Sequence, residues 1–214
     1  MEINNEPKVN IFGKFAPTAI LVWEFLKIVL IALIIIIPIR YFIFQPFIVS
    51  GASMEPNFYN AQYLIIDELT YHFKEPQRGE VVVLIHHFQT NERRSDGKEF
   101  YIKRVIGLPG EKIQIDNGRV TIINDQHPEG ITLDEPYLPN QGITYPHDPK
   151  IVGGKKTITL SSDEYFMMGD NRLASSDSRD WGPLKRADMV GRVLLRALPI
   201  TSFQLYTKSP VYSP

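Results

Sequence analysis

The sequence predicts a mostly β protein: an antiparallel β core with a small inserted second lobe, preceded by one N-terminal transmembrane helix. Three observations lead to this fold class. Short β-branched runs bounded by turn residues recur after Ser50, Asn117-Gly118 separates two alternating segments, and a long apolar stretch precedes Ser50. Such runs are typical of strands, and Asn-Gly between two of them is typical of a two-residue hairpin.

The apolar stretch has the length of a membrane-spanning helix. No charged residue lies between Ile28 and Ile39, and apolar character continues on both sides. A bilayer-spanning helix needs about 20 mostly apolar residues. A span from Trp23 to Ile43 has that length if Lys27 and Arg40 extend toward the two surfaces. Residues 21–45 are therefore assigned to a transmembrane anchor.

A cleaved signal peptide and a buried core helix are the alternatives to an anchor. A cleaved signal peptide has a shorter apolar core near the N-terminus, whereas this one begins late and is followed by Arg40 and two aromatic residues. A buried core helix is rarely so uniformly aliphatic. Lys8, Lys14 and Lys27 precede the uncharged run and Arg40 follows it, which favours a cytoplasmic tail over residues 1–20 with the rest of the chain outside.

The strands expected after Ser50 are bounded by Gly, Pro, Asn and Asp. We assign them to a catalytic core over residues 46–111 and 163–214 and to a small second lobe over residues 112–162. Residues 124–154 are expected to be irregular, because they are rich in turn-forming residues. The expected strands are Tyr63–Ile66, Val81–Ile85, Tyr101–Ile106, Ile113–Asp116, Arg119–Ile122, Thr157–Leu160, Tyr165–Met168 and Val190–Ala197.

Composition excludes several functional classes. A net charge of -1 gives no electrostatic reason to expect nucleic acid. The absence of cysteine excludes disulfides, a thiolate zinc site and a cysteine nucleophile. The 5 histidines show no ligand spacing, and no phosphate-cradling glycine loop is present. We therefore expect no metal and no cofactor.

Ser53 is the candidate nucleophile, in the segment Ser50–Pro56 just beyond the apolar stretch. A serine hydroxyl attacks only when a neighbouring base takes its proton. Gly51 and Ala52 leave the backbone open to an approaching carbonyl, and the N–H of Ser53 is available to an oxyanion hole. Taken alone, the segment is better explained as a polar turn at the membrane surface.

Lys103 is the candidate base. It lies in an expected strand, where alternation points it to the same face as Tyr101 and opposite to Ile102. A lysine acts as a base only when its amine is neutral, and burial in an apolar pocket lowers its pKa accordingly. In isolation, the residue is better explained as an exposed strand lysine with its aliphatic stem along the surface.

A third segment, Gly169–Arg179, is a dense polar loop after an expected strand. Ser175 could hydrogen-bond the Lys103 amine and direct it, and Asp177 could pair with Arg179 to hold the loop rigid. A solvated turn capped by Asp and Asn is the plain alternative.

Taken together and in this order, these segments resemble type I signal peptidase. The motifs that carry the resemblance are Ser53-Met54-x-Pro56, Gln62–Asp67, Arg78–Val83, Tyr101–Arg104 with Gly107–Gly110, and Gly169–Arg172 with Ser175, Asp177, Ser178 and Arg179. They lie within residues 28–111 and 163–197, which the resemblance largely covers.

The resemblance implies a function and roles. Ser53 would be the nucleophile, Lys103 the general base and Ser175 the group that orients it, with Asp177 and Arg179 bracing the loop. Signal peptides of preproteins would be cleaved after small residues, at a plasma (inner) or thylakoid membrane with the catalytic domain on the periplasmic or lumenal side. The partners would be signal peptides and the lipid bilayer. Apolar pockets for the small residues would be lined by Phe47, Val49, Met54, Phe58 and Ile102.

One departure from some relatives concerns the oxyanion hole. Gly51 stands where they carry a serine, so the oxyanion donors are expected to be mainly backbone groups. Two further functions stay open. One is a Ser-Lys protease of the self-cleaving repressor type, which a membrane span disfavours. The second is a catalytically silent, membrane-tethered β module that binds exported proteins.

Overall fold

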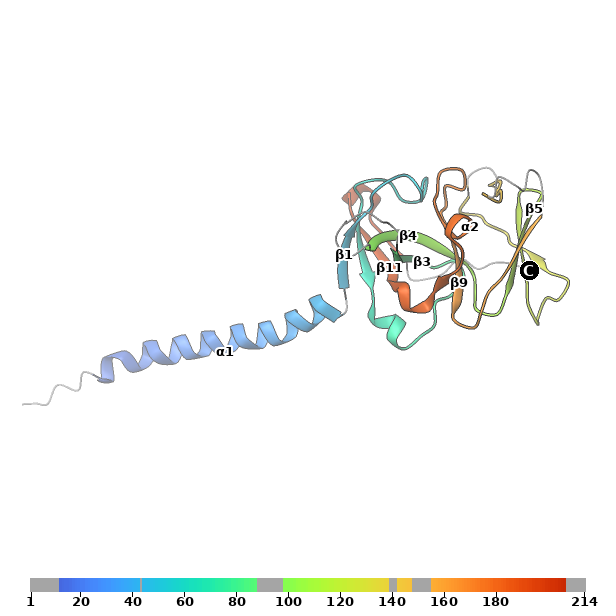
Figure 1. Cartoon of the computed structure of the whole chain (residues 1–214). Helices are drawn as coiled ribbons and strands as arrows, with labels where there is room; N and C mark the ends of the chain where they lie inside the picture. The colour runs from blue at the N-terminus through green and yellow to red at the C-terminus, as the bar shows by residue number, and fades with distance from the viewer. Residues whose placement is uncertain (1–11, 43, 88–97, 139–141, 148–154, 207–214) are drawn as a thin grey trace, which may run out of the picture. The chain divides into compact units, whose positions relative to one another are not determined.

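A computed structural model describes residues 12–42, 44–87, 98–138, 142–147 and 155–206. The chain forms two compact units, Met1–Phe42 and Ile43–Pro214. Figure 1 shows the first as a helix and the second as a β structure with short helical turns. The predicted fold class, mostly antiparallel β with few helices, is confirmed for the second unit.

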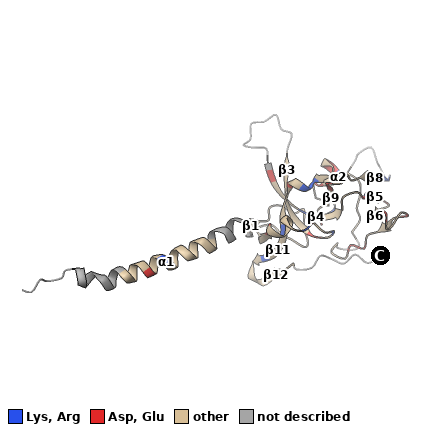
Figure 2. Ribbon diagram, turned by 90° about the horizontal axis from the view of Figure 1, so that it is seen from below, with Lys and Arg blue, Asp and Glu red and all other residues tan. Residues whose placement is uncertain are grey.

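The first unit contains helix α1, Phe12–Phe42. Between residues 20 and 36 its charged residues are Glu24 and Lys27, which pair at 2.6 Å. Figure 2 shows this stretch almost entirely in tan, the colour of uncharged residues. The helix starts inside the range 1–20 that the sequence suggested as a tail, since Lys14 is the only charged residue between Phe12 and Trp23. Within the described part of the chain, no helix meets the length and hydropathy required to cross a membrane.

The second unit is built on an eight-stranded antiparallel sheet. Its strands follow the order β1-β2-β11-β3-β4-β9-β10, and β12 pairs with β11. The strands are β1 Phe44–Ile48, β2 Tyr63–Asp67, β3 Val81–His87, β4 Lys98–Gly107, β9 Glu164–Met168, β10 Leu184–Lys185, β11 Met189–Leu198 and β12 Gln204–Leu205. Short helical turns connect them: η1 Leu69–His72, α2 Ser178–Trp181, η3 Arg186–Asp188 and η4 Ile200–Ser202.

A second, four-stranded sheet has the order β7-β6-β5-β8. Its strands are β5 Lys112–Asp116, β6 Arg119–Ile123, β7 Ile131–Thr132 and β8 Lys156–Thr159. Asn117 and Gly118 connect β5 to β6 with φ of 48° and 78°. Both values lie in the left-handed region that the predicted two-residue hairpin requires.

The two sheets share one hydrophobic cluster. Ile106, Phe166 and Met168 from the large sheet pack with Ile113 and Ile122 of the small one, and all five are fully buried. The small sheet therefore completes its core on the larger one, which is how a lobe this small buries an apolar face.

Strand β1 was not expected from the sequence. It begins at Phe44, inside the range 21–45 that the sequence assigned to the anchor. It was missed because Tyr41 to Phe44 contain no charged or turn-forming residue that would mark the end of the helix. β1 lies at the edge of the sheet and pairs only with β2 among the described strands. An edge position tolerates Pro46, which has no N–H to donate. β1 leads directly into the turn that carries Ser53.

Candidate active site

Sheet pairing brings the three polar segments together. Lys103 lies in the middle of β4, and Arg104 pairs with Met168 of β9, so the loop that follows β9 starts beside Lys103. The turn after β1 is held to this loop because the N–H of Asn171 donates to the carbonyl of Ser53 at 3.0 Å. Ser53 and Lys103, which are 50 positions apart in the sequence, thereby become neighbours.

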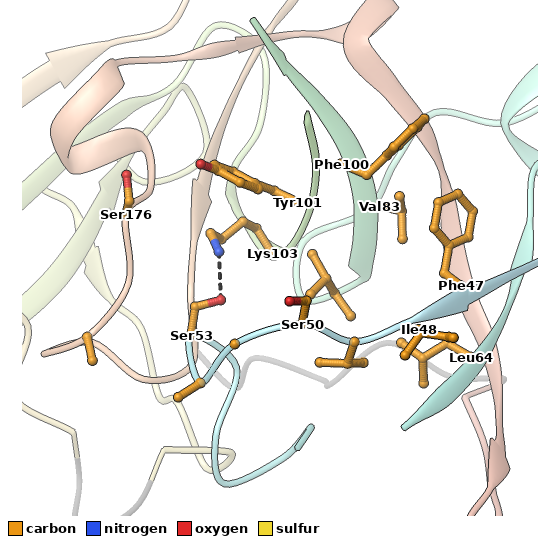
Figure 3. A pocket seen from close by; sticks show the side chains of 15 residues that line it. Phe47, Ile48, Ser50, Ser53, Leu64, Val83, Phe100, Tyr101, Lys103 and Ser176 are labelled. Atoms are coloured by element: carbon orange, nitrogen blue, oxygen red, sulfur yellow. Dashed lines mark hydrogen bonds between the residues drawn. The ribbon is translucent and has the colours of Figure 1, made fainter. Parts of the chain in front are cut away.

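Ser53 and Lys103 are in direct contact. The amine Nζ of Lys103 donates a hydrogen bond to Oγ of Ser53 at 2.8 Å, as Figure 3 shows. Lys103 is 3% exposed and Ser53 is half-buried. The hydroxyl thus remains open to a bound molecule while the amine is withdrawn from water.

Burial sets the protonation of Lys103. Desolvation lowers its pKa from 10.5 to about 8, because an ammonium loses hydration inside the protein. The carboxylates of Asp177 and Asp170 act in the opposite direction, and the charge of Arg179 adds to the lowering. A substantial fraction of this amine is therefore neutral near pH 8, which an exposed lysine does not achieve.

Asp177 and Arg179 form the ion pair that the sequence predicted. Nε and Nη2 of Arg179 donate to the two carboxylate oxygens of Asp177 at 2.8 and 2.7 Å, and both side chains are 0% exposed. Asp177 also accepts the N–H of Gly169 at 3.0 Å and caps helix α2. Burial alone would raise the pKa of Asp177, but these bonds to Arg179 and the backbone outweigh it and lower that pKa.

Ser175 is buried but does not make the expected hydrogen bond to Lys103. Among the described residues its Oγ has no hydrogen-bond partner. It lies close to the turn that carries the nucleophile candidate, because a Cβ added at Gly169 would overlap both Ser175 and the carbonyl oxygen of Ser53. Ser175 therefore lies near Ser53, and its hydroxyl has no hydrogen-bond partner among the described residues.

A second buried ion pair was missed from the sequence. Nε and Nη2 of Arg104 donate to Asp170 at 2.8 and 2.6 Å, and Asn57 adds a bond of 2.8 Å to the same carboxylate. Arg104 also lies over the ring of Tyr137 at 4.0 Å. In a strand, Arg104 points to the face opposite Lys103, so alternation was a usable signal for a charge on the other side of the sheet.

An apolar cavity of about 270 Å³ leads away from Ser53. Figure 3 shows Ser53 and Lys103 at one end and Phe47, Leu64 and Val83 toward the other. Of the residues predicted to line such a pocket, Phe47, Val49 and Ile102 do so. Side chains that the sequence did not point to also line it: Ile48, Leu64, Val83, Phe100, Tyr101, Ala174 and Ser176.

The prediction that Met54 and Phe58 line this pocket is wrong. Neither contributes to the cavity wall, and they are 1% and 0% exposed in the hydrophobic core. The turn after Ser53 coils back on itself, with the N–H of Phe58 donating to the carbonyl of Met54 at 2.9 Å. This coiling directs both side chains inward, away from the surface on which a substrate would lie.

The backbone around Ser53 is accessible. Gly51 has a φ of +91°, and an added Cβ there would meet no atom within 4 Å. Among the hydrogen bonds of the described residues, the N–H of Ser53 donates to none. A free backbone donor beside the hydroxyl is the kind of group that stabilises a developing oxyanion.

One described group has the ligand atoms for a metal ion, namely His147, Asp177 and Asp180. Both oxygens of Asp177 are engaged by Arg179, and His147 lies 2.8 Å from Asp180. The proximity of these three residues is thus accounted for by pairing within the protein.

A serine hydrogen-bonded to a buried lysine beside an open apolar cavity, in an antiparallel β unit, is the arrangement expected of a serine hydrolase. Comparison with known proteins identifies the family. Residues 22–198 match the family described as signal peptidase, peptidase S26. The chain belongs to this family and is a serine endopeptidase.

Individual relatives agree with this assignment. The chain is 34% identical to signal peptidase I P of Bacillus subtilis subsp. natto over 78% of its own length and 84% of the relative's. It is 33% identical to a signal peptidase I of Bacillus caldolyticus, over 81% of this chain and 90% of that protein. A probable signal peptidase I-2 of Synechocystis is 31% identical, over 85% of this chain and 75% of that protein.

Proposed function

We propose that this protein is a membrane-bound endopeptidase that removes N-terminal signal peptides from exported preproteins, cleaving after small residues. Ser53 is the nucleophile and Lys103 the general base. The observation that carries this proposal is the 2.8 Å hydrogen bond between them, together with a lysine only 3% exposed. Contact distance allows direct proton transfer, and burial keeps the base neutral near its working pH.

The chemistry follows from that contact. Neutral Lys103 takes the proton of the Ser53 hydroxyl as Oγ attacks the scissile carbonyl, and the N–H of Ser53 stabilises the oxyanion. Lys103 then gives its proton to the departing amine, which leaves as the mature N-terminus. Water, deprotonated by the same lysine, attacks the acyl group and restores Ser53 as the signal peptide leaves with a carboxylate.

The loop after β9 also supports the base. Asp177 and Arg179 brace it through their buried pair, and the capping of α2 fixes the loop from its other end. Ser175 orients the lysine once a substrate is bound. Its uncommitted hydroxyl supports that role, since unliganded sites often have long catalytic bonds that shorten in the complex.

Preference for small residues fits the cavity. A signal peptide bound as an extended strand points alternate residues to the same side, so its last and third-last side chains both face the wall. Bulky side chains crowd that wall: Phe47 and Phe100 pack with ring centroids 5.4 Å apart, beside Ile102. We attribute the preference for small residues to these side chains.

Two features support work at a membrane. Helix α1 exposes large apolar side chains all along residues 20–36, an arrangement that suits a bilayer better than water. The β unit carries an exposed apolar row at Ile48, Tyr63 and Leu198, which are adjacent across β1, β2 and β11. We assign the part of helix α1 from residue 21 to Phe42 as a single-pass anchor with a cytoplasmic N-terminus, in a plasma or thylakoid membrane. The expected range, which extends to residue 45, is too long, because Phe44 and Gln45 belong to strand β1.

Cleavage of a preprotein by the full chain in lipid vesicles tests the proposal. Ser53→Ala and Lys103→Ala should each abolish cleavage, whereas Ser162→Ala and Lys112→Ala, at exposed positions, should cleave as the parent does. Cleavage by either of the first two variants at the parental rate would refute the assignment. If the parent binds preproteins but cleaves none, a silent binding module replaces the protease.

A further inference from the structure

A second cavity, of about 470 Å³, lies beside the same turn that carries Ser53. Its wall includes Glu55, Pro56, Ile143, Asn171 and Leu173. It shares no lining residue with the apolar cavity described above, which is lined by Gly51 to Ser53, Ala174 and Ser176. The two cavities are therefore lined by adjacent stretches of the same two loops, the turn after β1 and the loop after β9.

Asn171 forms the boundary between them. Its N–H and side-chain amide hold the carbonyls of Ser53 and Ala52 at 3.0 and 3.1 Å, while the residue itself lines the second cavity. Glu55 is only two residues from Ser53, so their Cα atoms are at most about 7 Å apart. That distance equals the reach of about two extended substrate residues.

The direction of the bound chain follows from the first cavity. Its apolar wall extends from the Ser53–Lys103 end toward Phe47 and Val83 (Figure 3). A signal peptide that fills this cavity reaches Ser53 with its last residue. The polypeptide after the cleaved bond must then continue past Ser53, out of the first cavity. The second cavity, lined by Glu55 and Asn171, adjoins the same turn and is therefore available to it.

We propose that the second cavity binds the first residues of the mature protein and selects among them. This inference rests on the proposed function. The cavity takes an apolar or a basic side chain, most directly at the second residue after the cleaved bond, and disfavours an acidic one there.

The apolar preference comes from Leu173 and Ile143. They are 80% and 55% exposed, although both side chains are large and apolar. Exposed apolar side chains that meet in a hollow beside a reactive group mark a binding surface. A substrate side chain placed between them would remove apolar area from water on both molecules.

The charge preference comes from Glu55. The other charged residues of this wall are already committed, Asp170 to Arg104 and Arg172 to Glu135. Among the described residues, none hydrogen-bonds or ion-pairs with the Glu55 carboxylate, which is half-buried. An uncommitted carboxylate attracts a basic side chain and repels an acidic one, and salt screens both effects.

The test uses the full chain in lipid vesicles and one preprotein with small residues before the cleaved bond. Its second mature residue is Leu, Lys, Ala or Asp in turn. The parent should cleave the Leu substrate about fivefold better than the Ala substrate in kcat/KM, and the Lys substrate about threefold better than the Asp substrate at low salt.

The variants separate the two preferences. Leu173→Ser combined with Ile143→Ser should abolish the advantage of Leu and keep that of Lys over Asp. Glu55→Gln should do the reverse. Phe73→Ser is the matched control, because Phe73 is also 80% exposed but lies outside both cavities, and it should keep every preference.

The outcomes distinguish this inference from the proposed function. If the parent cleaves all four substrates within twofold of one another, or the variants change all four equally, the second cavity is not a substrate site. The dependence on Ser53 and on small residues before the bond would then still stand. If the parent cleaves none of the substrates, the protease assignment and this inference fail together.

Discussion

Nζ of Lys103 lies 2.8 Å from Oγ of Ser53, and the two residues come from different parts of the fold, a turn after β1 and the middle of β4. The lysine is 3% exposed, so this hydrogen bond joins a withdrawn amine to a hydroxyl that faces a cavity. The proposed activity depends on this contact, whereas the burial of Lys103 affects the pKa of its amine and the stability of the fold. Each of these effects can be measured separately.

The pH dependence of cleavage should reflect the lowered pKa of Lys103. Because the base acts only when neutral, log(kcat/KM) should rise with a slope of about 1 per pH unit and level off above pH about 8, the pKa to which burial lowers this amine. Steady-state kinetics of the parent across pH 6 to 10 measure this. A rate that stays constant from neutral to acidic pH would exclude Lys103 as the base.

Replacing Lys103 with Met should stabilise the inactive protein. The folded state holds this amine at a pKa of about 8 against 10.5 ordinarily, so folding with a charged lysine is disfavoured most below pH 8. After allowance for the lost bond to Ser53, the gain at pH 7 should be about 2 kcal/mol. Urea unfolding should show the gain shrinking as pH rises from 8 toward 10.5, because the unfolded lysine then also loses its proton.

Asp177→Asn should destabilise the fold strongly. It leaves the buried guanidinium of Arg179 without its counter-charge, at a cost of about 3–5 kcal/mol in the free energy of unfolding. Glu75→Gln is the matched control, since Glu75 is 78% exposed in its pair with Arg186 and should cost little. The pKa of Asp177 lies below 3.8, so the difference between parent and D177N should persist at neutral pH and shrink in acid.

Gly169→Ala should reduce cleavage through geometry alone. The added methyl would overlap the carbonyl oxygen of Ser53 and the side chain of Ser175, so the nucleophile must shift. A displacement of about 1 Å can lower kcat by about 100-fold. Gly110→Ala is the control, because its methyl would meet no atom within 4 Å and only backbone strain at a φ of +79° remains. Equal activity of the two variants would contradict the close approach.

Ser175→Ala should move stability and activity in opposite directions. Removing a buried hydroxyl that lacks a partner among the described residues should raise the free energy of unfolding by about 1 kcal/mol. If Ser175 orients Lys103 in the substrate complex, kcat should fall about tenfold or more. Threonine at this position, which retains a hydroxyl, should recover part of kcat. A more stable enzyme with unchanged kcat would leave Ser175 without a positioning role.

The strands were predictable where local pattern and tertiary environment agree. Alternation around Asn117-Gly118 predicted the β5–β6 hairpin, and each expected strand appears within a few residues of its boundaries. Strand β1 was missed because its apolar residues continue the run of helix α1, and hydropathy alone does not mark where a helix ends and an edge strand begins.

The sequence by itself determined the residue types to which the proposed chemistry is assigned. They are a serine after an open Gly-Ala turn, a lysine among apolar strand neighbours, and an acidic and a basic residue two positions apart. These follow from local spacing. Only the tertiary structure decided which side chains meet. Pairing of β4 with β9 brings Arg104 close to Asp170, which follows β9, and Lys103 becomes buried in the folded unit. Coiling after Ser53 turns Met54 and Phe58 into the core. Such contacts depend on long-range packing, because a side chain's burial is set by strands that are distant in the chain.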